Sequence, residues 1–283
     1  MHTLSVIIPA YNAQDTLREA LDSLLVQRGA ELQIIAVNDG STDNTAQVLE
    51  EFSQLHSLDI ISQENRGLGA ARNAGAQRAT GDWIAFLDAD DRWTPNKVTV
   101  LSKFLEKHPE AEWVYHNVWE WFMDGSLRKR KTVTYSQFSD VWENNPFTPS
   151  ATAIKKSTYD KTHGWEERRD RVEDLGLWKF LIDLGIQPLH ISRPLTKYRV
   201  GAGITSDAED HFAKVSTVWK EWVESGAMST MEFNLAIQRK HYELGRYFHK
   251  SSEFEKARYH YNKSAISARQ RLLVLATQMG LSL

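Results

Sequence analysis

The stretch Phe86-Leu87-Asp88-Ala89-Asp90-Asp91 decides the fold, because an apolar run that begins at Trp83 stops there in three carboxylates within four residues. Like charges this close resist joint ionisation unless a cation lies among them. Hard divalent cations such as Mg²⁺ and Mn²⁺ bind carboxylate oxygens and share their remaining positions with phosphates. An Asp-x-Asp standing alone would indicate a solvated turn. At the end of an apolar strand, the same residues predict a site for a metal and a diphosphate.

The residues before this stretch alternate short apolar runs with helical patterns. Such alternation is typical of βαβ units around a mostly parallel sheet. Small residues in the third helix permit the backbone to approach the sheet or a ligand closely. The expected strands are residues 4–8, 34–37, 58–61 and 83–87, and the expected helices are 17–25, a helix opened by Ser41 that runs through Phe52, and 68–78.

The residues after this stretch change character. Thr94-Pro95 predicts a helix start, and the following region is mixed α+β, rich in Trp and Tyr, with an amphipathic helix through Leu175 and Trp178. A helical connector and a helical tail come last. The sequence therefore predicts three regions: residues 1–108, 109–206 and 207–283.

The tail carries one helix pair at tetratricopeptide offsets. A lone repeat cannot bury its apolar face, so we expect it to pack on the main domain or to form a homodimer. The apolar segment 272–281 is expected to pack in a core or interface, with contact to a membrane surface as the alternative. The residues at the repeat offsets are Leu244, Gly245, Phe248, Ala257 and Tyr261.

Composition excludes several classes of protein. The chain has 283 residues, 41% of them hydrophobic, which is enough for a sizeable core. A net charge of -3 gives no general attraction to nucleic acid, so no nucleic-acid partner is expected. Cysteine is absent, which excludes disulfides and thiolate catalysis and suits a reducing cytoplasm. The start has no cationic or long apolar segment, so we expect no signal peptide or membrane span and a cytoplasmic location.

Four polar segments are expected to converge on one crevice. They are residues 9–12, 38–43, 67–73 and 88–91. All but the third, which opens a helix, come directly after a predicted strand. In open α/β sheets ligands bind along the carboxyl edge of the strands, so a single ligand could contact all four segments.

Together with Val172-Glu173-Asp174, these segments resemble glycosyltransferase family 2, the inverting nucleotide-sugar transferases of GT-A fold. The resemblance covers about residues 4–206. It implies an α/β fold with a Rossmann-like, mostly parallel sheet, a mixed α+β acceptor region and, in this chain, a C-terminal helical tail. It also implies that residues 1–108 bind the nucleotide sugar and that residues 109–206 bind the acceptor and supply the base.

The resemblance assigns roles to individual residues. Asp39 accepts the imide hydrogen of the base, usually uracil, and Tyr11 lies along the ring. Arg72 lies near the diphosphate, where a fixed cation and helix-start amides can hold anionic oxygens. The implied donor-binding residues are Pro9, Tyr11, Asn12, Asp39, Arg72, Asp88 and Ala89, and the implied ligands of Mn²⁺ or Mg²⁺ are Asp90 and Asp88.

The resemblance also implies an acidic pair for catalysis. Inversion needs one in-line displacement, hence a base for the acceptor hydroxyl and no enzyme nucleophile. The base is the second member of the pair, Asp174, and Glu173 supports it; a helix start favours the ionised form of Asp174. Gly201 departs from the family, because many relatives have a histidine there, in a loop that often covers the diphosphate. The contact that this histidine would make is either missing here or supplied by another group.

The expected function is metal-assisted transfer from a nucleoside-diphosphate sugar, a UDP-sugar first of all, to a glycan or lipid-linked acceptor. Such acceptors suit polysaccharide or cell-envelope biosynthesis and a location peripheral to the inner face of the membrane. One alternative is a nicotinamide oxidoreductase, from Gly67-Leu68-Gly69; however, Arg72 replaces the third glycine and the loop follows the third strand. Another is a non-catalytic nucleotide-sugar-binding or scaffold protein, against which the presence of Asp88, Asp90 and Asp174 argues.

Overall fold

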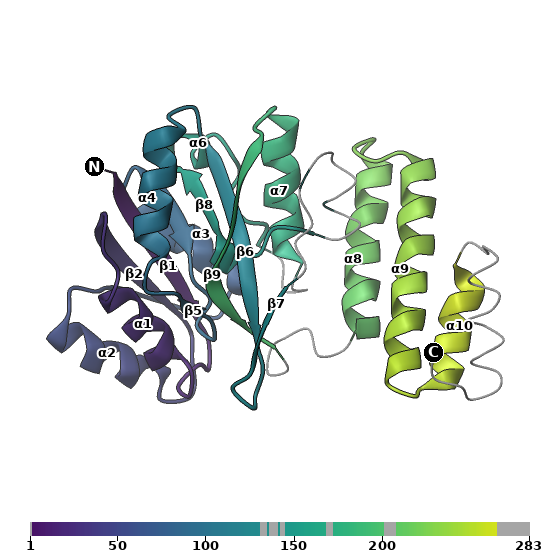
Figure 1. The fold of residues 1–283 in the computed structure, drawn as a ribbon, viewed down its shortest axis with the longest axis horizontal. Coiled ribbons are helices and arrows are strands. Elements are labelled where there is room, and N and C mark those ends of the chain that lie inside the picture. The colour runs from purple at the N-terminus through teal and green to yellow at the C-terminus, as the bar shows by residue number, and fades with distance from the viewer. Residues whose placement is uncertain are drawn as a thin grey trace. The chain divides into compact units, whose positions relative to one another are not determined.

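The computed structural model describes residues 2–130, 135, 141, 145–167, 172–200 and 208–264. The chain divides into two compact units, Met1–Ile204 and Thr205–Leu283. The first is a mixed sheet covered by helices, and the second is helical (Figure 1). Gly201 and the apolar segment 272–281 lie outside the described residues, so their predicted roles stay predictions.

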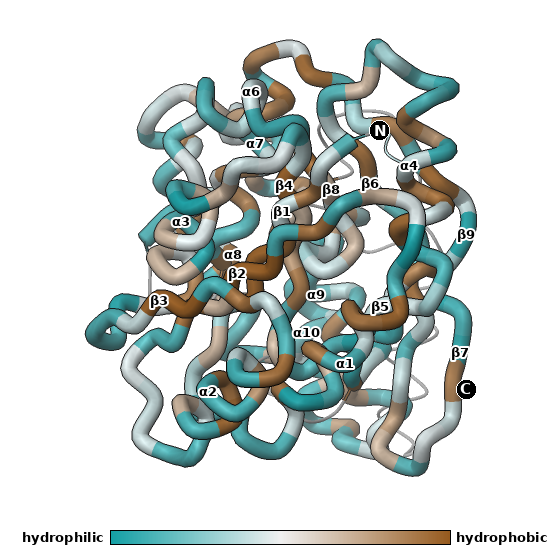
Figure 2. Tube along the Cα trace, turned by 90° about the vertical axis from the view of Figure 1, so that its left-hand side faces the viewer, coloured by the Kyte–Doolittle hydropathy of each residue, from teal (hydrophilic) through white to brown (hydrophobic). Residues whose placement is uncertain are grey.

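The amino-terminal half of the first unit is a parallel sheet in the order β3-β2-β1-β4. The four strands predicted from the apolar runs are confirmed, although the last ends one residue earlier than predicted. Figure 2 shows hydrophobic residues concentrated along β1 and β2. The strands are β1 (Thr3–Ala10), β2 (Glu31–Asp39), β3 (Asp59–Gln63) and β4 (Trp83–Phe86).

Helices cover both faces of this parallel half. Val6 and Ile8 point into an apolar cluster with buried residues of α1, α2 and α4, whereas Ile7 meets Gly75 of α3 on the opposite face. This alternation is the period of two expected of a strand buried on both sides. The helices are α1 (Leu17–Leu25), α2 (Thr45–Leu55), α3 (Leu68–Arg78) and α4 (Lys97–Lys107).

Gly75→Ala is expected to destabilise the first unit by about 1–3 kcal/mol, the usual cost of overpacking a core. A Cβ atom at position 75 would lie 2.4 Å from Cγ2 of Ile7, which is fully buried. Urea unfolding measures the loss, and Gln77→Ala at an exposed position of α3 is the control. A variant as stable as wild type would mean that the gain in helix propensity outweighs the contact.

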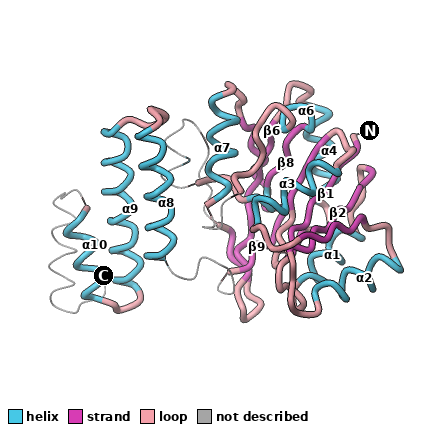
Figure 3. The backbone as a smooth tube through the Cα atoms, turned by 180° about the vertical axis from the view of Figure 1, so that it is seen from behind, coloured by secondary structure: helices cyan, strands magenta, loops and turns pink. Residues whose placement is uncertain are grey.

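The second half of this unit extends the sheet with mostly antiparallel strands. β8 pairs antiparallel with β4 and β6, and β9 runs parallel to β6 and antiparallel to β5. Figure 3 shows these strands side by side with the parallel half. The β5–β9 pairing brings the end of β9 back to the loop that follows β4. The elements are β5 (Arg92–Trp93), β6 (Trp113–Trp121), β7 (Leu127–Lys129), η1 (Pro149–Ala151), β8 (Thr152–Lys155), α6 (Lys156–Tyr159), α7 (Glu173–Asp183) and β9 (Pro188–Arg199).

The second unit contains α8 (Ala208–Glu224), α9 (Thr230–Lys250) and α10 (Phe254–Lys263). A capping box between Ser229 and Glu232 starts α9. The predicted helix pair is present as α9 and α10, because all five residues at the repeat offsets lie at their contact. Leu244, Phe248, Ala257 and Tyr261 form one buried cluster, and a Cβ atom on Gly245 would lie 2.5 Å from the Tyr261 ring. None of the described helices has both the length and the apolar composition needed to cross a membrane.

Candidate functional site

The loops after β1 and β2 are bonded to each other at the carboxyl edge of the sheet. The Asn12 N–H donates to Ser41 Oγ at 3.1 Å, and Asn12 Oδ1 accepts from the Thr42 N–H at 2.9 Å. Asn12 has a left-handed backbone with φ of 48°, which asparagine tolerates better than most residues. Tyr11 beside it is 50% exposed. Asn12 therefore holds two predicted donor loops together and leaves the Tyr11 ring accessible.

Asp39 connects the end of β2 to the start of α3. It is 3% exposed, and its carboxylate accepts from Gln63 Nε2 at 2.7 Å, the Arg66 N–H at 2.9 Å and the Gly67 N–H at 2.8 Å. A carboxylate has about four acceptor positions, so these three bonds leave it capacity for a further donor. The carboxylate fixes the loop that leads to Arg72, and its bond to a base stays a prediction.

The loop with the three carboxylates after β4 is locked by residues from η1 and β9. The Asp88 N–H donates to Ser150 Oγ at 3.0 Å. Arg199 donates from Nε to the Asp90 carbonyl at 2.8 Å and from its backbone N–H to Asp91 Oδ1 at 2.9 Å. Glu19 and the Trp121 ring hold the Arg199 side chain in turn. Neither Ser150 nor Arg199 carries a sequence signal for these contacts.

Crowded charge marks this loop as fit for a cation. Burial and the charge on Asp88 raise the pKa of Asp90 to about 6. Burial and the charge on Asp90 raise the pKa of Asp91 well above its ordinary value. Within the described ranges, no group of three or more His, Cys, Asp or Glu side chains is arranged to hold a metal by itself. A cation held by Asp88 and Asp90 would therefore need further ligands, such as the phosphate oxygens that usually complete the coordination of Mg²⁺.

Arg72 joins this loop to the acidic pair at the start of α7. Its guanidinium donates to Asp88 Oδ1 at 2.7 Å and to Glu173 Oε1 at 2.9 Å, and its side chain is 2% exposed. The guanidinium carbon lies 4.3 Å from the centre of the Trp165 ring. Two segments separated by most of the domain thus meet at one cation. We call this arrangement of Asp88, Arg72 and Glu173 the Arg72 bridge.

The Arg72 bridge changes the protonation of its members. Burial alone would lower the pKa of Arg72, but the charges on Asp88 and Glu173 outweigh it and raise the pKa above its ordinary value. Burial raises the pKa of Glu173, against the opposing effect of Arg72. Glu173 is 4% exposed and already bonded, so it is suited to a supporting role.

Asp174 follows Glu173 and is only partly buried. Its Oδ2 atom accepts from Asn145 Nδ2 at 2.8 Å and from Trp178 Nε1 at 3.4 Å. The buried Trp178 ring stacks on Trp113 at 5.4 Å and anchors α7 in the core. Sequence reasoning found Asp174 but not Asn145, because nothing in the sequence links residues so far apart.

Gly69 serves protein packing, and Gly67 has a backbone φ of 94° at the start of α3. A Cβ atom on Gly69 would lie 2.0 Å from the Glu166 carbonyl oxygen. The backbone of the segment before α7 therefore packs directly against Gly69, in the space that a side chain would fill. This contact accounts for Gly69 without a dinucleotide and removes the main observation that favoured an oxidoreductase.

Hydrogen bonds and ion pairs join several of the predicted site residues into one network, whereas Ala89 and Pro9 are part of the core and the sheet. The β1–β2 loop contacts join Asn12 to the loop after β2, and Asp39 leads through α3 to the Arg72 bridge. Ala89 is 8% exposed and its side chain belongs to the apolar core, so only its backbone is available to a ligand. Pro9 lies within β1 beside Val37.

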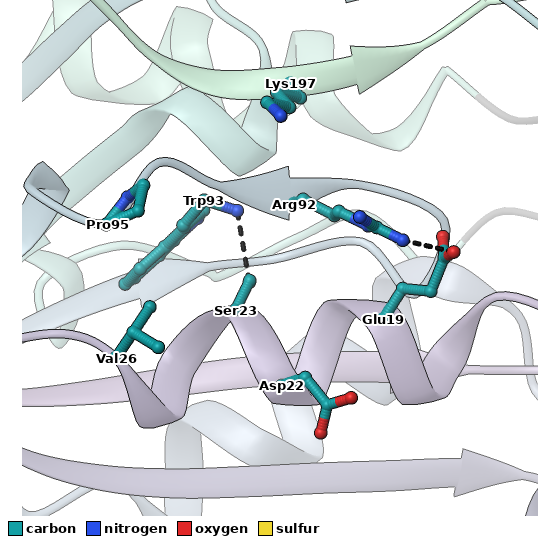
Figure 4. Close-up of a pocket in the computed structure, with 8 residues that line it drawn as sticks. All are labelled: Glu19, Asp22, Ser23, Val26, Arg92, Trp93, Pro95 and Lys197. Carbon is teal, nitrogen blue, oxygen red and sulfur yellow. Dashed lines mark hydrogen bonds and ion pairs between the residues drawn. The ribbon is translucent and has the colours of Figure 1, made fainter. Parts of the chain in front are cut away.

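A pocket of about 260 Å³ lies away from this network, between α1 and β5 (Figure 4). Within it the Trp93 N–H donates to Ser23 Oγ at 3.1 Å, and Glu19 forms an ion pair with Arg92. It contains none of the predicted site residues, and Glu19 and Arg92 in its lining are connected to the site through Arg199 and Asp91. The residues that line it are Glu19, Asp22, Ser23, Val26, Arg92, Trp93, Pro95 and Lys197.

Two solved structures with a similar fold are complexes with nucleotide sugars. TarS of S. aureus, in complex with UDP-GlcNAc, is 17% identical with a TM-score of 0.61, over 98% of this chain and 88% of that one. The mannosyltransferase PcManGT of Pyrobaculum calidifontis, in complex with GDP-Man and Mn²⁺, is 17% identical with a TM-score of 0.63, over 98% and 79%. At this identity the likeness establishes the GT-A fold, as expected.

Sequence comparison identifies the family. Residues 5–165 match the family described as Glycosyl transferase family 2. Glycosyltransferase GlyA of Streptococcus pneumoniae is 27% identical over 78% of this chain, and the match spans 33% of its own length. An uncharacterised glycosyltransferase of Haemophilus influenzae is 30% identical over 68% of this chain and 67% of its own length. The chain therefore belongs to glycosyl transferase family 2.

Proposed function

We propose that this enzyme transfers a sugar from a nucleoside-diphosphate sugar to a hydroxyl of a glycan or lipid-linked acceptor, with inversion and with Asp174 as the base. The Arg72 bridge carries this proposal, because one buried guanidinium contacts both Asp88 and Glu173. The acids assigned to the donor and those assigned to the acceptor are thereby held beside each other, as a single displacement requires.

The donor-binding residues we propose are Pro9, Tyr11, Asn12, Asp39, Arg72, Asp88 and Ala89. The exposed Tyr11 ring, beside the bonded loops after β1 and β2, can stack on a base. The remaining acceptor capacity of Asp39 suits the imide hydrogen of uracil, so a UDP-sugar is the first candidate. The UDP-GlcNAc in the TarS complex supports this choice, and the GDP-Man in the PcManGT complex supports a guanine nucleotide as second candidate.

Asp90 and Asp88 are the residues we propose for Mn²⁺ or Mg²⁺. When bound, the cation supplies Lewis-acid stabilisation of the departing nucleoside diphosphate. Arg199 and Ser150 hold the loop that carries both carboxylates. The Mn²⁺ in the PcManGT complex supports the same choice of cation.

The proposed chemistry is one displacement. The acceptor hydroxyl gives its proton to the Asp174 carboxylate while its oxygen bonds to the anomeric carbon, and the bond from that carbon to the diphosphate oxygen breaks. Glu173 does not compete as base, because it is buried and bonded to Arg72. Its negative charge, next to Asp174, favours the protonated product state.

A thermal-stabilisation screen of nucleotide sugars with and without Mn²⁺ tests the donor proposal. Binding to the folded state raises Tm, and we expect a UDP-sugar to give the largest, Mn²⁺-dependent rise. Asp90→Asn should lose the Mn²⁺-dependent part, whereas Asp22→Asn, whose side chain is 53% exposed on α1, should keep it. No stabilisation by any nucleotide sugar would refute the proposal, and an unchanged Mn²⁺ response in Asp90→Asn would remove Asp90 as a ligand.

We propose a polysaccharide or cell-envelope acceptor, handled at the inner face of the membrane. A homodimer through the C-terminal helices is the arrangement that we propose for the tail.

A further inference from the structure

Asn145 contacts the proposed base from a segment that carries no sequence motif. Its Nδ2 donates to Asp174 Oδ2 at 2.8 Å, a short bond for a neutral donor. The same oxygen accepts from Trp178 Nε1 at 3.4 Å. The Asn145 amide is therefore the stronger of these two donors to Asp174.

The surroundings of Asn145 fix its orientation. Its Oδ1 atom accepts from the Phe147 N–H at 3.2 Å, and its own N–H donates to the Val141 carbonyl at 3.0 Å. Phe147 is 1% exposed and lies 4.3 Å from Trp113, centre to centre. Since the carbonyl end of the amide is occupied by a backbone donor, the NH₂ end has to face Asp174.

The backbone of Asn145 is also special. Its φ of 27° lies in the left-handed region, where most side chains are strained and asparagine is tolerated. Strain of this kind persists where the surrounding structure enforces it, and it gathers at functional sites. Asn12, in the donor loops, shares the feature with a φ of 48°.

We propose that Asn145 is a positioning residue that orients Asp174 for the acceptor hydroxyl and favours its ionised form. A neutral N–H donor stabilises a carboxylate relative to the acid, and it fixes one oxygen without cancelling the charge as a guanidinium would. The charges of Glu173 and Arg72 also act on Asp174, and substitutions at Asn145 leave both groups in place. The inference rests on the proposed function for the role of Asp174, but the contact itself is independent of it.

Two substitutions test the hydrogen bond from the Asn145 amide to Asp174 separately from the turn that the backbone of Asn145 forms. Asn145→Asp keeps an oxygen for the Phe147 N–H, and replaces the donor by a second negative charge. Asn145→Gly tolerates the left-handed backbone and removes the side chain altogether. Asn96→Asp makes the same chemical change at an exposed position before α4 and is the matched control.

The first readout is the pH titration of the Asp174 carboxyl, followed by ¹³C NMR on aspartate-labelled protein and assigned with Asp174→Asn. We expect its midpoint to move up by about one pH unit or more in Asn145→Asp, by less in Asn145→Gly, and to stay in place in Asn96→Asp. The second readout is the pH dependence of UDP-GlcNAc hydrolysis. Its acid limb should move in the same direction, with the KM for the donor within about twofold and the rate partly recovered at high pH.

Unchanged Asp174 titration in both Asn145 variants overturns the inference, whatever the activities are. A uniform loss of rate at all pH values, with the titration in place, also overturns it, because that is the behaviour of a structural defect. Full activity of Asp174→Asn refutes the proposed base instead, and leaves the titration result on Asn145 standing. The two failures are therefore distinguishable.

Discussion

Asp174→Asn is expected to lower sugar transfer by about 10²–10⁴-fold, the usual contribution of a positioned general base. The amide is nearly isosteric and can stay near Asn145 and Trp178 on α7, but it cannot accept the proton of the acceptor hydroxyl. The donor loops are held by other contacts: Asp39 accepts from Gln63 and from the backbone of Arg66 and Gly67, and Asp88 is bonded to Arg72 and Ser150. Loss of rate without loss of donor binding is the expected signature.

Steady-state kinetics and donor-induced Tm shifts, measured on the same preparations, check this expectation. Asp183→Asn is the matched control, since Asp183 is on the same helix, its side chain is 58% exposed, and it pairs with Lys179. The control should keep wild-type kcat. A rate for Asp174→Asn equal to that of the control would remove Asp174 from the role of base, and a lost donor shift would place it in donor binding.

The sheet and its helices could be predicted because their patterns are local. The third helix was expected over 68–78 and occupies Leu68–Arg78, since glycine precedes it and small residues fill it. The second helix begins at Thr45 instead of Ser41. The Ser41 hydroxyl accepts from the Asn12 N–H and so holds the loop, whereas Asp43 accepts from the N–H of Thr45, the first residue of the helix, and from the N–H of Gln14. Contacts between distant loops leave no trace in the periodicity of either one.

The candidate site could be predicted in outline for a related reason. Parallel strands place their following loops at one edge, so the convergence of the motifs follows from topology. The hydrogen-bond partners of each side chain do not follow from the topology. Arg72 was expected beside a diphosphate, and its contact with Glu173, 101 residues away, depends on how α7 packs. Asn145 and Ser150 carry no sequence signal because their contacts with Asp174 and Asp88 join residues 29 and 62 positions apart.

Arg72→Met is expected to destabilise the first unit by about 3–5 kcal/mol, the usual cost of removing one partner from a buried ion pair. Side-chain exposures of 2% for Arg72 and 5% for Glu173 leave water little access to the orphaned carboxylate. Arg66→Met is the matched control: its ion pair with Glu167 at 2.6 Å is just as short, but the side chains are 57% and 46% exposed. An exposed pair of this kind contributes less than about 1 kcal/mol. Urea unfolding of both variants gives the comparison.

The destabilisation caused by Arg72→Met should also depend on pH and become smaller as the pH falls. Burial already raises the pKa of Glu173 above its ordinary value of 4.5, and loss of the guanidinium removes the main opposing charge. The folded variant then binds a proton more tightly than the unfolded chain, so its stability rises relative to wild type as pH falls through the raised pKa. Adding Glu173→Gln should recover part of the loss at pH 7, because it replaces a buried charge by a neutral group. A cost no greater than that of Arg66→Met, and independent of pH, would mean that the Arg72 bridge does not hold the two acidic segments together.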